Sequence, residues 1–248
     1  MSNFQHVWLI WSLAFLSVFV VIYLFYPRLR TEMLRAAIGT TPFGLTEPLF
    51  VPVYWSPPSL FDLARTTGFD IESLIFSFSI GGIGSVLYNL VTGRVSYPGK
   101  MSGHHRFHWL AVATPAFVFL PLMATGWNPI YPAVIAMAAG AVAAALCRPD
   151  LLSKTLAGGA LFLGLYAIFM ITLRIGAPGY IEQVWNLRDL SGWLIAGIPL
   201  EEFLFGGAFG LYWASVYEHL TWASARRDPE KVELTFSQTE PQTCGDKK

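Results

Sequence analysis

The sequence predicts an all-α polytopic membrane protein with about seven transmembrane helices, arranged as two parallel three-helix repeats joined by a linker helix. Three observations predict this fold. First, 54% of the 248 residues are hydrophobic and only 13% are charged, with a mean hydropathy of +0.50, far more apolar than a soluble domain. Second, hydrophobic runs recur at lengths that span a bilayer. Third, two of these runs begin with acidic residues in related surroundings.

The first repeat, residues 1–92, contains three predicted helices. Residues 7–26 are an apolar run of spanning length, which we expect to be retained because no basic cluster precedes it and no small-residue cleavage site follows. Residues 31–51 are interrupted by glycines and prolines, which leaves open a broken second helix or an irregular loop dipping into the headgroups. Residues 52–69 form a loop rich in proline and aromatics, and the third helix covers 70–91.

The linker, residues 93–128, is predicted to contain a fourth helix at 107–124. The second repeat, residues 129–222, contains three more helices and an outer loop. The helices are residues 129–146, about 155–173 and 193–222, and the loop is residues 174–192. Residues 223–248 are polar and predicted to form a disordered tail on the inner side.

The positive charges orient the predicted helices. Seven spans with the N-terminus outside and the C-terminus inside place most Lys and Arg residues on the inner side, as expected for cytoplasmic loops. The inner set is Arg28, Arg30, Arg35, Arg94, Lys100, Arg106, Arg148, Lys154, Arg226, Arg227 and Lys231, against Arg65, Arg174 and Arg188 outside. We therefore expect a multi-pass protein of the plasma (inner) membrane, with its site between the two repeats.

The composition argues against two other classes of protein. The formal net charge of zero gives no case for a nucleic-acid partner. The two cysteines, Cys147 and Cys244, both fall on the predicted inner side, so no disulfide framework is expected.

An acidic pair, Glu201-Glu202, opens the last predicted helix, two residues after Pro199. A weaker copy, Glu72-Ser73, opens the third helix. A shift of 129 positions superposes Gly68 on Gly197, Glu72 on Glu201, Phe76 on Phe205, Gly81 on Gly210, Tyr88 on Tyr217 and Thr92 on Thr221. These coincidences predict a duplicated chain with one acidic helix in each half.

Carboxyl groups inside a membrane helix are costly and point to function. Two adjacent carboxyls in a low dielectric cannot both ionise easily, so one of Glu201 and Glu202 is expected to stay neutral and able to donate a proton. The alternative is helix capping, since an acid in a first turn complements the helix dipole. Capping accounts for one acid more readily than for two. Helix capping is also the alternative to a functional role for Glu72, and the position of Asp70 suits the N-cap of that helix.

Aromatic residues follow both acidic helix starts and are candidates for a binding cavity that stabilises a cation. The candidates are Phe76, Phe205, Phe209, Tyr212 and Tyr217. Phe205 and Tyr212 lie at i+4 and i+11 from Glu201, so we expect them to share its face. Ordinary packing and an interfacial aromatic belt are the alternatives.

No cofactor and no metal are predicted. His104, His105 and His108 lie in a basic loop without acidic partners, which is a poor metal site. The run from Gly81 to Gly84 lies inside a membrane helix, so it favours close helix packing over dinucleotide binding. A retinal protein would need a lysine in its last helix, and a Glu-Glu protease would need an arginine where Gly206 stands.

The motif Pro199-x-Glu201-Glu202, with Phe205 after it and Tyr217-Glu218 at the end, resembles the carotenoid (lycopene) cyclase domain family. The resemblance covers most of the chain and implies two similar membrane-embedded halves, here fused. The first half departs from the pattern, because Asp70-x-Glu72-Ser73 stands where the family usually shows Pro-x-Glu-Glu.

The resemblance implies an enzyme of the intramolecular lyase (isomerase) type in carotenoid biosynthesis. It would cyclise an end of a linear carotenoid such as lycopene to a β-ionone ring through a carbocation, without redox change or cofactor. Glu201 is expected to be the proton donor, Glu202 its partner or base, and Glu72 their counterpart across the repeat. Two alternatives stay open: a non-catalytic carotenoid- or lipid-binding membrane protein of the same fold, and a carotenoid end-group hydratase.

Overall fold

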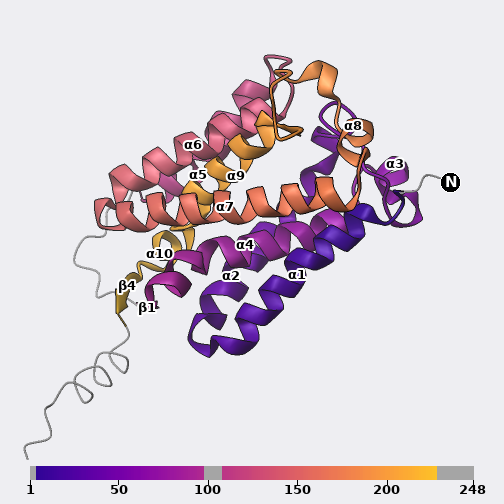
Figure 1. The fold of residues 1–248 in the computed structure, drawn as a ribbon. Coiled ribbons are helices and arrows are strands. Elements are labelled where there is room, and N and C mark those ends of the chain that lie inside the picture. Colours follow the sequence, from indigo (N-terminus) through magenta and orange to yellow (C-terminus); the bar gives the residue numbers. More distant parts are fainter. Residues whose placement is uncertain (1–3, 98–107, 228–248) are drawn as a thin grey trace, which may run out of the picture.

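The chain is a bundle of helices, shown in Figure 1, and the computed structural model describes residues 4–97 and 108–227. The main helices are α1 Val7–Phe25, α2 Arg30–Thr40, α4 Ile71–Thr92, α5 His108–Met123, α6 Ile130–Cys147, α7 Leu152–Gly176, α9 Leu200–Trp213 and α10 Val216–Thr221. The short helices are η1 Pro27–Leu29, η2 Thr41–Leu49, η3 Leu60–Asp62, α3 Leu63–Thr67, η4 Pro149–Leu151, α8 Tyr180–Val184 and η5 Leu187–Asp189. The strands are β1 Arg94–Tyr97, β2 Leu194–Ile195, β3 Ile198–Pro199 and β4 Ser224–Arg227.

The apolar helices make the chain an α-helical membrane protein. Within the described ranges, four helices are long and apolar enough to cross a bilayer, namely α1, α4, α6 and α7 with η4, whereas α5 is apolar but shorter. The remaining predicted spans are built from two shorter pieces each, α2 with η2 and α9 with α10. Seven spans and their orientation therefore stay a prediction.

The second predicted segment is helical, so the alternative of an irregular loop is wrong. It begins as α2 and continues as η2, a 3-10 helix that contains Pro48 and has a proline in its first turn. Proline lacks the N–H that an α-helix would use. The hydroxyls of Thr40 and Thr41 donate to carbonyls of the preceding turn, those of Ala36 (2.6 Å) and Ala37 (2.8 Å), and hydrogen bonds of this kind favour bending of a helix.

The last predicted helix begins seven residues late, at Leu200 instead of Trp193. Three residues with positive φ, Gly192, Ala196 and Gly197, place a tight β2–β3 hairpin before it. The helix also breaks between α9 and α10. The predicted disordered tail is wrong at its start, because β4 pairs antiparallel with β1; residues 228–248 lie outside the described residues.

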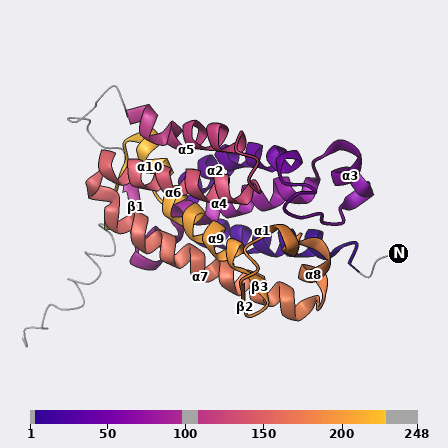
Figure 2. The same cartoon turned by 90° about the horizontal axis from the view of Figure 1, so that it is seen from above.

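The two halves have similar internal packing. In the first half, α4 packs between α1 and α2, and in the second half α9 packs between α6 and α7. The halves meet through α4 and α7, through β1 and β4, and through a bridge that joins Trp55 to Trp185. Figures 1 and 2 show α3, α8 and the N-terminus at one end of the bundle, here called the motif end, and α10, β1 and β4 at the other.

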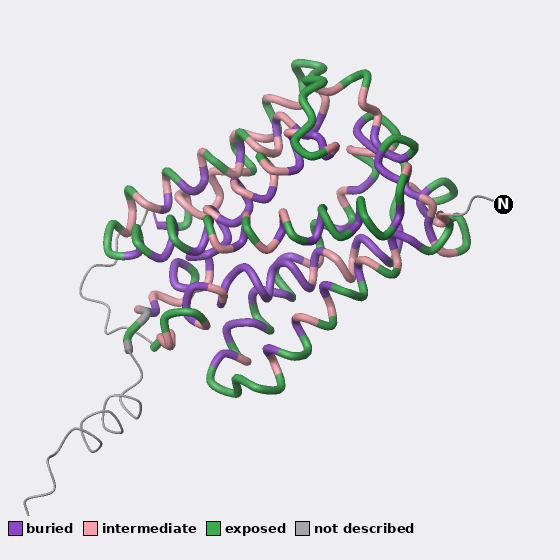
Figure 3. The backbone as a smooth tube through the Cα atoms, in the orientation of Figure 1, coloured by how far each residue is buried: buried purple, intermediate pink, exposed green. Residues whose placement is uncertain are grey.

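Glycines bring the central helices into close contact. A Cβ on Gly81 would lie 1.5 Å from Thr40 Oγ1, and one on Gly82 would lie 2.3 Å from Phe19 Cε2. The interpretation of this glycine run as a packing site is therefore confirmed. Figure 3 shows the buried positions concentrated on the helix faces that meet inside the bundle.

A buried charge cluster joins the halves at the end opposite the motif end. Lys154 Nζ lies 2.8 Å from Glu32 Oε1 and also pairs with Glu218. Asn89 Nδ2 donates to Glu32 Oε2 (3.0 Å) and to Ser96 Oγ (3.0 Å), and Ser96 Oγ donates to Glu218 Oε1 (2.6 Å). We call these five side chains the Lys154 cluster. Each buried charge in it has an ion-pair or hydrogen-bond partner, and burying any of these charges alone would cost free energy.

Candidate functional site

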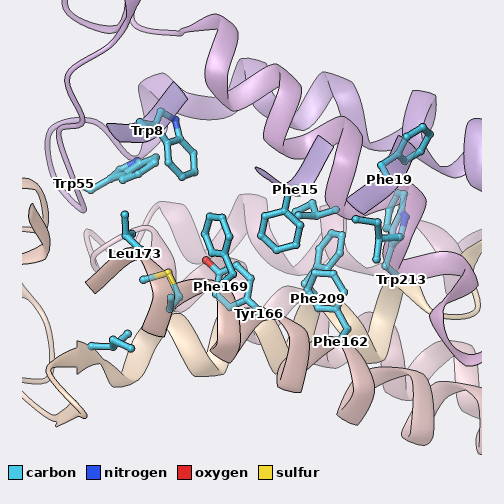
Figure 4. Close-up of a cluster of buried hydrophobic side chains, with 14 of the residues drawn as sticks. Trp8, Phe15, Phe19, Trp55, Phe162, Tyr166, Phe169, Leu173, Phe209 and Trp213 are labelled. Atoms are coloured by element: carbon cyan, nitrogen blue, oxygen red, sulfur yellow. The ribbon is translucent and has the colours of Figure 1, made fainter. Parts of the chain in front are cut away.

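A cavity of about 440 Å³ lies between the two halves and is walled mainly by apolar side chains. Both halves contribute: η2 and α4 from the first, α7 and α9 from the second, with further residues from α5 and α6. Figure 4 shows a cluster of buried hydrophobic side chains that extends from Trp8 and Trp55 to Trp213. Six of its labelled members also line the cavity: Trp8, Trp55, Tyr166, Phe169, Phe209 and Trp213. Along α9 the lining extends from Glu202 to Trp213, which is roughly 16 Å at the helical rise.

Glu202 presents its carboxyl group to this cavity and is almost completely buried. Its Oε1 accepts hydrogen bonds from the Tyr54 hydroxyl and from Trp185 Nε1 (2.7 Å), and its Oε2 accepts one from the Tyr166 hydroxyl (2.5 Å). Burial and the nearby Glu202 carboxylate raise the pKa of Tyr54 well above its usual value. Tyr54 therefore remains a hydrogen-bond donor throughout the neutral range.

Each of these three donors is delivered by a different part of the fold. Tyr54 and Trp185 sit on the loops that meet at the bridge between Trp55 and Trp185. Tyr166 comes from α7 and reaches Glu202 across Gly206, where a Cβ would lie only 2.7 Å from the tyrosine Cδ1. The site is therefore assembled by tertiary contacts between both halves.

Glu201 points away from this cavity. Its Oε1 accepts hydrogen bonds from the Tyr131 hydroxyl (2.7 Å) and the Ser191 backbone N–H (2.8 Å). It lines a smaller pocket of about 170 Å³ with Trp193 and the loop before α9. Its Oε2 is buried without a partner among the described residues. In this position Glu201 ties the outer loop to the start of α9.

Glu72 has a similar position in the first half. Its Oε1 accepts a hydrogen bond from the Leu60 backbone N–H (2.7 Å), so it ties the preceding loop to α4, and it does not line the large cavity. Asp70 is confirmed as the N-cap, because its Oδ1 accepts from the Ser73 N–H (2.5 Å).

Four of the five predicted aromatic residues line the cavity: Phe76, Phe205, Phe209 and Tyr212. Tyr217 does not. Phe205 and Tyr212 share the cavity with Glu202, so the expectation that they face Glu201 is wrong. The reason is that α6 and α7 hold α9 with the next residue of the acidic pair turned inward.

Sequence reasoning missed several residues that surround the cavity. Tyr54, Tyr166 and Trp185 carry no local pattern that marks them as partners of a glutamate. Glu47 also lines the cavity and is buried. An acid in an otherwise apolar membrane segment was a signal that could have found it.

Of the three histidines considered as metal ligands, only His108 lies within the described residues. His104, His105 and Cys244 lie outside the described residues. His108 Nδ1 lies 3.0 Å from Cys147 Sγ. Within residues 4–97 and 108–227, no group of three His, Cys, Asp or Glu side chains is placed to hold a metal ion.

Comparison with known proteins gives one finding. Residues 128–220 match the model of the lycopene cyclase family, a region that covers α6 to α10 and includes Glu202 and Tyr166. No curated protein and no solved structure matches the chain.

Proposed function

We propose that this chain, which belongs to the lycopene cyclase family through residues 128–220, cyclises the end of a linear carotenoid to a β-ionone ring. The family match itself supports a carotenoid cyclase-like function in a membrane protein. The ring type, the chemical mechanism and the residues that perform it are our proposal.

The observation that carries the proposal is a buried carboxyl group in an apolar, aromatic cavity. Cyclising a polyene end needs a proton for the terminal double bond, shelter from water for the carbocation, and a base for a neighbouring proton. Glu202 supplies an acid–base group. The ring faces of Phe76, Phe205 and Phe209 can stabilise a cation inside the cavity. No electron is gained or lost, so no redox cofactor is needed.

We therefore propose that Glu202, and not Glu201, is the catalytic member of the acidic pair. The Glu202 carboxyl lines the cavity. Glu201 and Glu72 hold loop N–H groups, and we propose that they position the walls of the site. This arrangement also supports the predicted relation between the halves, since Glu72 and Glu201 make equivalent contacts.

A lateral opening suits a substrate that stays in the bilayer. Three of the cavity-lining residues, Phe43, Ala116 and Leu120, are themselves exposed on the outer surface of the bundle. They belong to η2 and α5, so we propose that the polyene enters sideways between these two elements. Its end would then lie along α9 toward Glu202.

The matched pair Glu202→Gln and Glu201→Gln tests the proposal. Each variant and the parent are expressed in a lycopene-accumulating host, and the pigments are separated by chromatography. Glu202→Gln should lower cyclisation by roughly 10²- to 10⁴-fold, as expected for loss of an acid–base group. Glu201→Gln keeps an acceptor oxygen for Ser191 and should retain most activity. The reverse result would refute the assignment.

Product analysis separates the remaining functions. Membranes assayed in D2O should place one deuterium in each new ring, with product mass otherwise unchanged. A product heavier by one water would indicate a hydratase. Lycopene that co-purifies unchanged with the parent protein would indicate a binding protein without catalysis.

A further inference from the structure

The cavity contains a second carboxyl group that belongs to no recognised motif. Among the described residues that line it, the only acids are Glu202 from α9 and Glu47 from η2. Glu47 is 7% exposed, although it lies on a segment that the sequence alone leaves ambiguous. A carboxyl group buried in an apolar membrane cavity is costly, so its presence calls for a reason.

The backbone brings Glu47 to the place where the first half lacks an acid. The shift of 129 positions aligns Glu202 with Ser73. At Gly44, one 3-10 turn before Glu47, η2 approaches α4 so closely that a Cβ would lie 2.8 Å from the Ser73 carbonyl oxygen. Glu47 and Ser73 line the same cavity.

The surroundings of the two carboxyls correspond. Trp185 Nε1 donates to Glu202, and Trp55 lines the cavity together with Glu47. Trp55 and Trp185 form the bridge between the halves, with ring centroids 5.3 Å apart. Each half thus places one carboxyl and one of these two bridging tryptophans beside the cavity, although the first half takes its carboxyl from η2.

The hydrogen bonds differ in a way that suggests different roles. Both oxygens of Glu202 accept hydrogen bonds, from three donors in total, which stabilise the negative charge that Glu202 carries when it acts as a base. Glu47 Oε1 is buried and has no hydrogen-bond partner in the described part of the chain. An ionised oxygen left unpaired there would be strongly destabilised, so Glu47 is held as the neutral acid.

We infer that Glu47 is the second catalytic carboxyl of the site, an inference that rests on the proposed function. The Glu47 O–H bond breaks as its proton adds to the terminal double bond, and the electrons of a second double bond form the ring C–C bond. The resulting cation loses a neighbouring proton to Glu202, and that C–H electron pair becomes the ring double bond. One proton leaves Glu47 and one reaches Glu202, so substrate and product are isomers. Glu202 then releases its proton to water and Glu47 takes one up from water between turnovers, which restores the starting state.

The test compares Glu47→Gln with Glu182→Gln, which changes an exposed glutamate on α8. Purified variants are assayed for conversion of lycopene and for the amount of lycopene that co-elutes with the folded protein. Glu47→Gln should lose at least 10²-fold in turnover and still retain bound lycopene. Glu182→Gln should match the parent in both. A purely structural role would lower binding and folded yield together with turnover.

A second variant moves the carboxyl instead of deleting it. Adding Ser73→Glu to Glu47→Gln returns an acid to the aligned helix position and should recover at least tenfold of the lost turnover. If Glu47→Gln does not fold, the variant Glu47→Asp tests the role of Glu47. It shortens the proton donor, so turnover should fall while the amount of retained lycopene stays unchanged. Parental turnover in the folded Glu47→Gln variant, or in Glu47→Asp, would overturn the inference.

The outcomes also separate this inference from the proposed function. A parent protein that converts no lycopene would refute the function. A parent that cyclises lycopene, with Glu202→Gln inactive and Glu47→Gln fully active, would leave the function standing and refute only the role of Glu47.

Discussion

The contact between Tyr166 and Gly206 allows a one-methyl test of the Glu202 site. In Gly206→Ala the new Cβ would lie 2.7 Å from Tyr166 Cδ1, 3.1 Å from Cγ and 3.2 Å from Cβ. Ordinary contact needs about 3.5 Å, so the ring must move by roughly 0.8 Å. Phe162, Phe169 and Phe205 pack around that ring and limit the directions in which it can move.

The expected cost follows from the hydrogen bond that this movement strains. Tyr166 donates to Glu202 Oε2 at 2.5 Å, and a hydrogen bond to a charged group contributes about 1.5–3 kcal/mol. If the loss falls on the transition state, cyclisation slows roughly 10- to 150-fold. The measurement is the ratio of cyclised to linear pigment over time in membranes at equal protein amounts.

The adjacent glycine is the matched control. In Gly207→Ala the nearest side-chain atom to the new Cβ is Leu163 Cδ2, at 3.8 Å, which is ordinary contact. Both changes gain about 0.8–1 kcal/mol of helix propensity, so only the contact with Tyr166 separates them. Gly207→Ala should keep parental activity. If both variants kept parental activity, or both lost the same amount, the role given to Tyr166 would be refuted.

Three further predictions address the surrounding fold. Gly44→Ala should push η2 away from α4 and lower turnover to the level of Glu47→Gln, measured by pigment conversion; parental turnover would contradict it. Lys154→Met leaves two buried carboxylates without their cation and should destabilise the folded protein by about 3–5 kcal/mol, seen as a lower midpoint of thermal unfolding in detergent. Because the pKa of Tyr54 is raised in the folded state, its contribution to stability is complete below about pH 10, the unfolded value, and is lost as pH rises further. Tyr54→Phe should therefore unfold with a weaker dependence on alkaline pH than the parent, and an unchanged dependence would count against the buried Tyr54.

The hydrophobic runs predicted the main helices because helix length and apolar content are properties of local sequence. The predicted residues 7–26 and 129–146 correspond to α1 Val7–Phe25 and α6 Ile130–Cys147. The start of α9 was misplaced because positive-φ residues on both sides of β2 turn the chain. Apolar content does not reveal such a turn.

The acidic pair was recognised in the sequence, but its inward-facing member was not. Adjacent helical positions point about 100° apart, and only the packing of α9 against α6 and α7 decides which carboxyl faces the cavity. Glu47 and Tyr54 reach the same cavity from a bend and a loop whose courses depend on contacts with the other half. Such groups could not be placed from local patterns.

The cavity wall is also rich in tryptophan, whose indole ring is fluorescent. Four of the nine tryptophans in the chain, Trp8, Trp55, Trp185 and Trp213, line the cavity. A conjugated polyene seated against their rings would quench indole emission. Titrating the protein with polyenes of different length would then report how deeply each one enters. For the proposed cyclisation, the same signal would follow release of the ring-bearing product in real time.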